Sequence, residues 1–354
     1  MAAERKKVFV ALSGGVDSST AAALLNQNGF NCAGVFMITC DQSHHAQADA
    51  EQMCEKLGIK LYVLDLRRDF ERILDYFCSE YRKARTPNPC VLCNRYIKFG
   101  KLWDFARSNG AGLLATGHYA RILEHNNHIG LYESLYAAKD QSYVLSMLDK
   151  EILPYIILPM GNYSKDQTRQ MAAKFGLGIE YKAESQELCF IPDDDYVAVL
   201  EQRCPELVRK GNIIDSSGKV LGEHNGVHRF TIGQRRGLRV AMGKPYYVVK
   251  IDAESNTVTL GPKEEVMKSK LWATGVNWLT EEPSSSFRAK VKIRYNDIGA
   301  PARIFPQGSR VAVEFDEPNS AITPGQLAAF YVQEENNSRL IGGGWIDKAA
   351  DGNS

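Results

Sequence analysis

One segment constrains the fold of this chain more than any other. The residues Ser13-Gly14-Gly15-Val16-Asp17-Ser18-Ser19 lie directly between an apolar run, Val8 to Leu12, and a helical pattern over residues 17–28 that stops at Gly29. Glycines permit a tight turn, and the free N–H groups of a helix N-terminus bind anions. A strand, a glycine turn and a helix in this order predict an α/β fold with a phosphate-binding loop.

The rest of residues 1–205 continues the alternation of strand and helix patterns. Further strands are expected over residues 32–38, 61–66 and 112–116, and helices over 46–57, 70–81 and 95–107. Ser164 and Gln167 form a capping box for a helix that ends before Gly176. Strands that alternate with helices pair in parallel, so we expect a mostly parallel sheet with helices on both faces.

The pattern changes after Pro205. Short alternating runs at 246–251, 257–260, 289–293 and 310–315 lie between turn residues, and a second break is expected near residue 270. We therefore expect three domains, over residues 1–205, 206–269 and 270–348. The second and third are expected to be rich in β-strands.

Composition excludes several classes of protein. The chain has 354 residues, a formal net charge of +1 and eight cysteines. It contains no apolar run of the ~18 residues that a membrane span needs, and its N-terminus lacks the apolar core of a signal peptide. We expect a cytoplasmic protein without a membrane partner, whose cysteines are thiols, metal ligands or catalysts rather than a disulfide framework.

The near-neutral total hides basic and acidic segments. Residues 67–101 hold nine Lys/Arg against four Asp/Glu, residues 203–250 hold ten against three, and residues 288–310 hold six against one. Residues 180–201 hold seven acidic residues against one basic. Two interpretations stay open: the basic segments form one phosphate-binding face, or they are scattered solvated side chains.

The loop resembles a known nucleotide site. Ser13 and Ser18 add hydroxyl donors to it, and Asp17 is suited to hold Mg²⁺ on phosphates. Neither a Walker motif nor GxGxxG is present. The loop resembles that of the PP-loop ATP pyrophosphatase superfamily, whose members adenylate a substrate oxygen and release pyrophosphate. It therefore implies the chemistry but not the substrate.

Two cysteine segments carry the second signal. In Thr86-Pro87-Asn88-Pro89-Cys90-Val91-Leu92-Cys93-Asn94, the two X-Pro steps predict a non-helical stretch, with a helix just after Cys93. A cysteine at a helix N-terminus between Arg85 and Arg95 is expected to have a lowered pKa and thiolate character. Cys189 lies in a distant segment, residues 184–192. Two thiols that meet in the fold can carry and release sulfur through a persulfide and a disulfide.

Together these segments resemble the tRNA-specific 2-thiouridylase family (MnmA type) over nearly the whole chain. The separated matches are the loop, TPNPCVLCNRYIKFG, ATGHYAR, AAKDQSYVL, SQELCFIP, HRFTIGQRRGL, KIRYND and the late PGQ. The resemblance implies a PP-loop (Rossmann-like) domain, a central β-rich domain and a C-terminal β-barrel. It also implies a tRNA-uridine 2-sulfurtransferase that uses ATP and Mg²⁺, converts the wobble uridine at tRNA position 34 to 2-thiouridine and releases AMP and pyrophosphate.

The resemblance also assigns residues. Cys93 matches the catalytic nucleophile and Cys189 the persulfide carrier. ATP is expected to contact Ala11, Leu12, Ser13, Gly14, Gly15, Val16, Asp17, Ser18, Met37 and Gly117. The tRNA or its target base is expected to contact Asn88, Pro89, Cys90, His118, Lys139, Asp140, Gln141, Arg294, Tyr295 and Gln326. The sulfur donor is expected to be sulfide or a cysteine-desulfurase relay.

Cys90 departs from the aspartate that many family members carry. With Cys93 and Cys189 it gives three thiolates, which can hold a 4Fe–4S cluster with one iron open to hydrosulfide. This cluster route and the persulfide route both stay open, and they need opposite roles for Cys93 and Cys189. Zinc is a third option, although a structural zinc site requires a fourth ligand, and a simply packed Cys90 is a fourth.

The remaining cysteines are expected to be structural. Cys32, Cys40, Cys54 and Cys78 fall on apolar positions and are expected to be buried, and Cys204 has no evident partner.

Two rival functions remain, a PP-loop ligase acting on a small metabolite and a non-catalytic RNA-binding protein. The first has no need of two β-rich accessory domains, and the second does not need Cys93 or Cys189.

Overall fold

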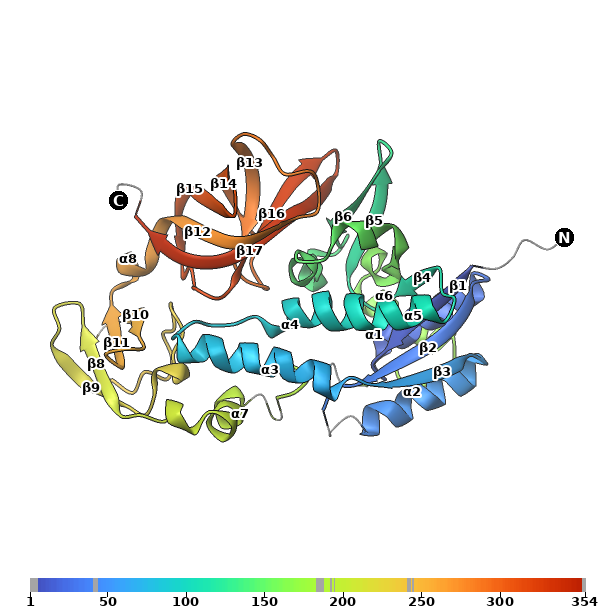
Figure 1. Cartoon of the computed structure of the whole chain (residues 1–354), viewed down its shortest axis with the longest axis horizontal. Coiled ribbons are helices and arrows are strands. Elements are labelled where there is room, and N and C mark those ends of the chain that lie inside the picture. Colours follow the sequence, from blue (N-terminus) through green and yellow to red (C-terminus); the bar gives the residue numbers. More distant parts are fainter. Residues whose placement is uncertain are drawn as a thin grey trace. The chain divides into compact units, whose positions relative to one another are not determined.

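A computed structural model describes residues 6–40, 44–182, 188–191, 193, 195–240, 243 and 245–351. Two compact units divide it. Unit 1 contains residues 1–73, 90–190 and 333–341, and unit 2 contains residues 74–89, 191–332 and 342–354. The structure is shown in Figure 1.

A five-stranded parallel sheet forms the centre of unit 1. Its order is β3-β2-β1-β4-β7, and every neighbouring pair is parallel. The strands are β1 (Lys7–Leu12), β2 (Asn31–Ile38), β3 (Lys60–Asp65), β4 (Leu113–Ala115) and β7 (Ile156–Ile157). The four strands expected from the sequence are confirmed within one residue at each end.

Helices cover both faces of this sheet because β1 is apolar on both of its sides. Val8, Val10 and Leu12 pack against α1 (Val16–Gln27) and α2 (His44–Leu57). Phe9 points to the other face, where its ring meets those of Tyr62 and Phe105. A strand without a solvent-facing side is typical of a parallel sheet.

The other helices of unit 1 follow from local signals. Ser164 caps α6 (Lys165–Lys174), and the capping box with Gln167 is confirmed. A continuous helical run joins α4 (Pro89–Leu92), the π-helical segment η2 (Cys93–Lys101) and α5 (Leu102–Ser108). Helix α3 (Arg67–Arg82) begins in unit 1 and ends in unit 2. Single-turn helices are η3 (Ala137–Lys139), η4 (Ser142–Leu145), η5 (Lys150–Tyr155) and η6 (Pro159–Asn162).

Unit 1 also contains an antiparallel hairpin, β5 (Ala120–His125) and β6 (His128–Glu133). Its turn residues Asn126 and Asn127 both have positive φ, as a two-residue hairpin turn requires. The first residues of β17 (Asn337–Ala350) extend this pair through Leu340 opposite Leu131.

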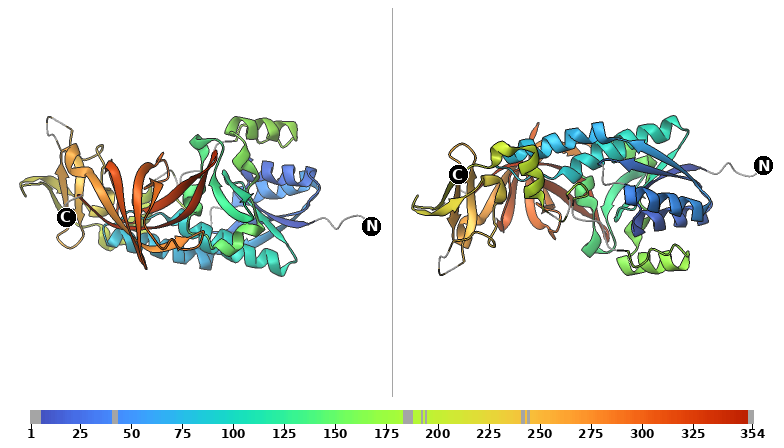
Figure 2. Two further views of the ribbon diagram at one scale, coloured as in Figure 1. Left: turned by 90° about the horizontal axis from the view of Figure 1, so that it is seen from above. Right: turned by 90° about the horizontal axis from the view of Figure 1, so that it is seen from below.

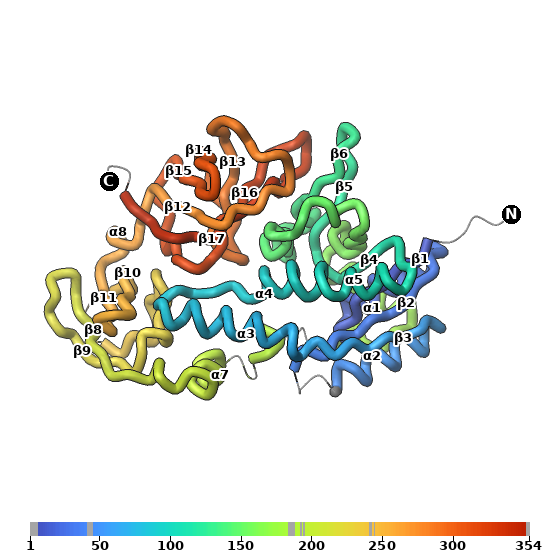
Figure 3. The backbone as a smooth tube through the Cα atoms, viewed as in Figure 1, coloured from blue at the N-terminus to red at the C-terminus, as the bar shows by residue number. Residues whose placement is uncertain are grey.

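The first part of unit 2 is a small sheet of four strands, traced in yellow to orange in Figure 3. Its order is β10-β11-β8-β9. The strands are β8 (Gly211–Asp215), β9 (Val220–His224), β10 (Tyr247–Asp252) and β11 (Thr257–Gly261). Val248, Val258 and Leu260 form its core with Ile213. Helix α7 (Tyr196–Arg203) and the turns η8 (Pro205–Leu207) and η9 (Val227–Arg229) flank it in the chain.

The second part of unit 2 is a closed β-barrel, seen as curved orange to red strands in Figure 2. After α8 (Lys263–Val266), its strands follow the order β12-β15-β14-β13-β16-β17, and β12 pairs with β17 to close the ring. The strands other than β17 are β12 (Met267–Trp278), β13 (Phe287–Lys292), β14 (Ala300–Gln307), β15 (Arg310–Ser320) and β16 (Leu327–Glu334).

The expected fold class is therefore confirmed: a parallel α/β domain is followed by a small β-domain and a β-barrel. Among the described residues, none of the helices combines the length and the apolar character that crossing a membrane requires.

Candidate functional site

The glycine loop lies at the carboxyl edge of the parallel sheet, between β1 and α1. Gly14 has a φ of +71°, and a Cβ there would lie 2.6 Å from the carbonyl oxygen of Ala46. The Ser13 N–H donates to Ser18 Oγ at 3.2 Å, and Ser18 Oγ donates to the Gly15 carbonyl. The expected turn therefore exists, and its own serines hold it closed.

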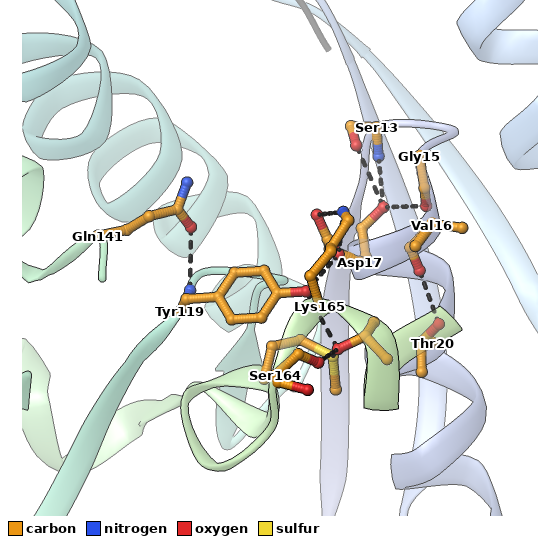
Figure 4. A network of polar contacts seen from close by, with 12 residues as sticks. Ser13, Gly15, Val16, Asp17, Thr20, Tyr119, Gln141, Ser164 and Lys165 are labelled. Atoms are coloured by element: carbon orange, nitrogen blue, oxygen red, sulfur yellow. Dashed lines mark hydrogen bonds and ion pairs between the residues drawn. The ribbon is translucent and has the colours of Figure 1, made fainter. Parts of the chain in front are cut away.

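The carboxylate of Asp17 is fully engaged, as Figure 4 shows. Lys165 Nζ lies 2.8 Å and 2.9 Å from its two oxygens, and the Tyr119 hydroxyl donates to Oδ1 at 2.7 Å. Asp17 can therefore serve as an oxygen ligand for Mg²⁺ only in exchange for Lys165. Neither partner is predictable from the sequence, because both lie more than 100 positions away and no local pattern links them to the loop.

A second lysine, Lys182, contacts the loop at a different residue from Lys165. Lys182 Nζ donates to the Gly14 carbonyl at 2.8 Å and also contacts the Asp49 carboxylate. The SGGVDSS sequence contains no basic residue. Two downstream lysines thus supply the positive charge that the loop itself lacks.

The other residues expected at ATP come from the same edge of the sheet. Met37 is at the end of β2, and Gly117 follows β4. A Cβ on Gly117 would lie 2.7 Å from the Ser18 nitrogen and 2.9 Å from the Asp17 carbonyl carbon. Only glycine allows this backbone to approach the N-terminus of α1 so closely.

His118 is buried beside this approach. Its Nδ1 lies 2.7 Å from Thr116 Oγ1, and its ring packs against Phe99. Burial, assisted by the Lys98 charge, lowers the pKa of His118 well below its usual value. The imidazole is therefore neutral near pH 7 and offers hydrogen bonding rather than charge.

The segment 139–141 uses most of its polar side chains internally. The buried Asp140 carboxylate accepts hydrogen bonds from the Ser134 and Ser142 N–H groups and from the Ser142 hydroxyl. Gln141 Oε1 accepts the Tyr119 N–H at 2.9 Å. Asp140 thus shapes the turn, while Lys139 and Gln141 remain partly exposed.

The cysteine segment differs from expectation in two ways. Residues 86–88 are non-helical as predicted, but helix α4 already begins at Pro89, so the predicted helix start after Cys93 is wrong. Proline is well suited to the first helical position, where its missing N–H costs nothing. Cys93 is therefore inside a helical run rather than at its free N-terminus.

The second difference concerns the Cys93 thiol. Burial raises its pKa to about 11, and the charge of Lys98 offsets this only in part. Arg95 is engaged with Asp149 at 3.0 Å, so it does not stabilise a thiolate here. The expected lowered pKa is wrong for this tRNA-free structure, because desolvation outweighs the nearby positive charge.

The three candidate thiols influence one another's pKa values. Burial is the main cause that raises the pKa of Cys90, and Cys189 adds to it. Burial likewise raises the pKa of Cys189, with Cys93 as the next cause. Cys189 is exposed as a residue, but desolvation around its sulfur is the main cause that raises its pKa to about 11. Residues 183–187 and 192 of its motif lie outside the described part of the chain.

All eight cysteines are free thiols. Among the described residues, which include Cys90, Cys93 and Cys189, no three Cys, His, Asp or Glu side chains converge as metal ligands. The geometry shown therefore does not fit the expected cluster site, and no step is derived through it.

The residues of the C-terminal part of unit 2 that are expected to contact tRNA lie in two places. Arg294 and Tyr295 are exposed between β13 and β14. Gln326 Nε2 instead donates to the carbonyls of Thr86 and Pro87, both at 3.0 Å. Gln326 thereby holds the stretch that leads into Asn88.

Two expectations for the remaining cysteines need correction. Cys40 is only half-buried, because it lies just beyond the end of β2. Cys204 is buried and does have partners: Arg82 Nη2 donates to its sulfur at 3.3 Å, and its thiol hydrogen-bonds with that of Cys78. Cys32, Cys54 and Cys78 are buried as expected.

The raised pKa of Cys93 predicts a specific pH dependence in metal-free protein. A thiol with a pKa of about 11 is protonated at neutral pH, so iodoacetamide alkylation of Cys93 should accelerate about tenfold per pH unit from pH 7 to 10. Mass spectrometry of the Cys93 peptide measures the rate. In urea-unfolded protein the rate should instead level off above a pH of about 8.5. A plateau near pH 7 in folded protein would contradict the burial argument.

Comparison with known proteins places the chain in a family. It matches the sequence models of the tRNA methyl transferase HUP domain over residues 6–193, the tRNA methyl transferase PRC-barrel domain over 198–262 and the aminomethyltransferase beta-barrel domain over 268–346.

Full-length relatives agree with these matches. The tRNA-specific 2-thiouridylase MnmA of Carboxydothermus hydrogenoformans is 45% identical, over 97% of this chain and 98% of that protein. That of Syntrophotalea carbinolica is 44% identical, over 98% and 100%. That of Geobacter metallireducens is 43% identical, over 98% of each. This chain therefore belongs to the tRNA-specific 2-thiouridylase family.

Proposed function

We propose that this chain is a tRNA-uridine 2-sulfurtransferase that uses ATP to convert the wobble uridine of tRNA to 2-thiouridine. The observation that carries the proposal is the glycine loop of β1 and α1 in one unit with Cys93 and Cys189. An ATP loop supplies activation of an oxygen, and paired thiols supply sulfur transfer. Near full-length relatives named for this activity support the same substrate.

The first step is activation of the base. Uridine O2 attacks the α-phosphorus of ATP, the bond to pyrophosphate breaks, and an adenylated O2 becomes a good leaving group. The loop from Ala11 to Ser18, with Met37 and Gly117 beside it, binds the nucleotide in this proposal. Mg²⁺ would be held by Asp17 after release from Lys165, and when bound it neutralises phosphate charge.

The second step is sulfur transfer. The terminal sulfur of a Cys189 persulfide attacks C2, and AMP leaves with the original oxygen. The Cys93 thiolate then attacks Cys189 Sγ, which forms a Cys93–Cys189 disulfide and releases the thiolated base. The persulfide is renewed in one of two ways. Either a thiol reductant reduces the disulfide and a cysteine desulfurase relay then transfers sulfane sulfur to the Cys189 thiol, or sulfide itself attacks Cys189 Sγ of the disulfide, which forms the Cys189 persulfide and releases the Cys93 thiolate. Since Cys93 is buried and protonated without tRNA, the bound substrate must favour its thiolate.

The tRNA contacts belong to both units. We propose that Cys90, His118 and segment 139–141 of unit 1 contact the tRNA or its target base, and that Asn88, Pro89, Arg294, Tyr295 and Gln326 of unit 2 contact it as well. Base recognition outside the duplex stack is typical of enzymes that modify single bases. The domain division at 1–205, 206–269 and 270–348, and action in the cytoplasm, are parts of the same proposal.

Nucleoside analysis tests the proposed reaction directly. Wobble-uridine tRNA incubated with the enzyme, ATP and sulfide or a desulfurase relay should yield 2-thiouridine. Cys93→Ser and Cys189→Ser should each reduce the yield to below about a hundredth, because each removes a sulfur that bonds during transfer. Cys54→Ala, a buried thiol packed under β2, is the matched control and should stay within about threefold. No 2-thiouridine from wild-type protein, with or without air, would refute the function.

The cluster route remains a distinct proposal for the same reaction, and iron analysis separates the two. In it, Cys90, Cys93 and Cys189 would hold a 4Fe–4S cluster that supplies the sulfur, which needs a cysteine arrangement other than the one described. Strictly anaerobic purification should then give about four irons per chain, which Cys90→Ser should lose. The persulfide route predicts no stoichiometric iron and full activity of Cys90→Ser. If the wild-type protein contains iron and Cys90→Ser loses activity, the three cysteines must be able to adopt an arrangement other than the one described.

A further inference from the structure

Tyr119 connects two segments that the proposed function assigns to different substrates. It is 2% exposed, between the loop of β4 and the first residue of β5. Its hydroxyl contacts Asp17 Oδ1 at 2.7 Å, and also Thr168 Oγ1 at 3.0 Å. Thr168 has a further partner, since its hydroxyl donates to the Ser164 carbonyl. One buried side chain thus contacts the ATP loop and the start of α6 together (Figure 4).

The backbone of Tyr119 contacts Gln141, in the segment that is expected to bind tRNA. Its N–H donates to Gln141 Oε1 at 2.9 Å, and its carbonyl accepts the Gln141 N–H at 2.7 Å. The Gln141 side chain is partly exposed. Oε1 accepts the Tyr119 N–H, and the Nε2 group of the same amide can donate to an acceptor on tRNA. A tRNA contact that reorients the Gln141 amide would therefore also change the hydrogen bond to Tyr119.

We propose that Tyr119 is a positioning residue, which orients the Asp17 carboxylate in the ATP loop and makes that orientation depend on the contact that Gln141 makes. This inference rests on the proposed function, because it takes Gln141 as a tRNA contact. Tyr119 touches neither reacting atom. It acts through Asp17, whose negative charge is balanced by Lys165 at 2.8 Å (Figure 4).

The physical basis is the hydrogen bond between a buried hydroxyl and a charged group. Such bonds are stronger than neutral ones and fix the direction of the carboxylate. Without the hydroxyl, Asp17 can follow the flexible Lys165 side chain. A coupling between two sites must also be reciprocal, so tRNA should change ATP affinity by the factor by which ATP changes tRNA affinity.

Tyr119→Phe removes only the hydroxyl and is the test variant. Tyr132→Phe on β6 is its matched control, because Tyr132 is 1% exposed and donates to the Glu334 carboxylate at 2.6 Å in the same unit. Binding of the non-cleavable analogue α,β-methylene-ATP is measured by calorimetry. Each protein is titrated alone, with a wobble-uridine tRNA transcript, and with a transcript carrying cytidine at that position.

In wild-type protein the wobble-uridine transcript should change the analogue affinity at least about fivefold, a typical size for coupled sites. Tyr119→Phe should bring this factor below about twofold and weaken binding of the analogue roughly tenfold. Tyr132→Phe should leave both the coupling factor and the analogue affinity unchanged. Gln141→Ala should lose the coupling and, because it removes the acceptor of the Tyr119 N–H, should also weaken the analogue in the absence of tRNA.

Three results would overturn the inference. They are an unchanged coupling factor in Tyr119→Phe, no coupling in the wild type, and equal loss in Tyr132→Phe. If Gln141 contacts the tRNA outside the target base, the cytidine transcript should change the analogue affinity by the same factor as the uridine transcript. A lower factor with cytidine still supports the connection, because it places the contact at the base itself. Since no turnover is needed, absence of 2-thiouridine with intact coupling would count against the proposed reaction and not against Tyr119.

Discussion

The charge of Asp17 is the constraint on which the nucleotide side of the site depends. The Asp17 carboxylate, in the first turn of α1, is paired with Lys165 from α6 and accepts a hydrogen bond from Tyr119 at the end of the β4 loop. These contacts fix α6 and the ATGHYAR segment against the loop. The close approach of Gly117 to Ser18 completes the same arrangement. One ionic group therefore brings three distant segments to the carboxyl edge of the parallel sheet, where α/β proteins bind their ligands.

The cysteine side of the site follows a different principle. Cys93 lies in a helical run that starts at Pro89, and its surroundings exclude water. Burial keeps the thiol protonated and unreactive, with Lys98 as the group that favours the thiolate. A buried thiol is also less open to oxidation than an exposed thiolate. In the proposed reaction, the surroundings of Cys93 would have to change for its thiolate to form.

Local patterns were enough to predict much of the fold. The β1–loop–α1 unit, the parallel strands and the Ser164 capping box are each encoded within a few neighbouring residues. The contacts that complete the site are not. Lys165, Lys182 and Tyr119 reach the loop through tertiary packing, and no spacing in the sequence marks them. The expected thiolate at Cys93 failed for the same reason, because basic neighbours in sequence do not reveal burial.

The central claim is that ATP activates the oxygen that sulfur replaces. It is tested most directly with a tRNA whose wobble uridine carries ¹⁸O at O2. If O2 is adenylated and then displaced, each turnover transfers the label to the phosphate of AMP, which mass spectrometry detects in equal amount to the 2-thiouridine formed. Recovery of the label in water or in pyrophosphate, with unlabelled AMP, would contradict the account.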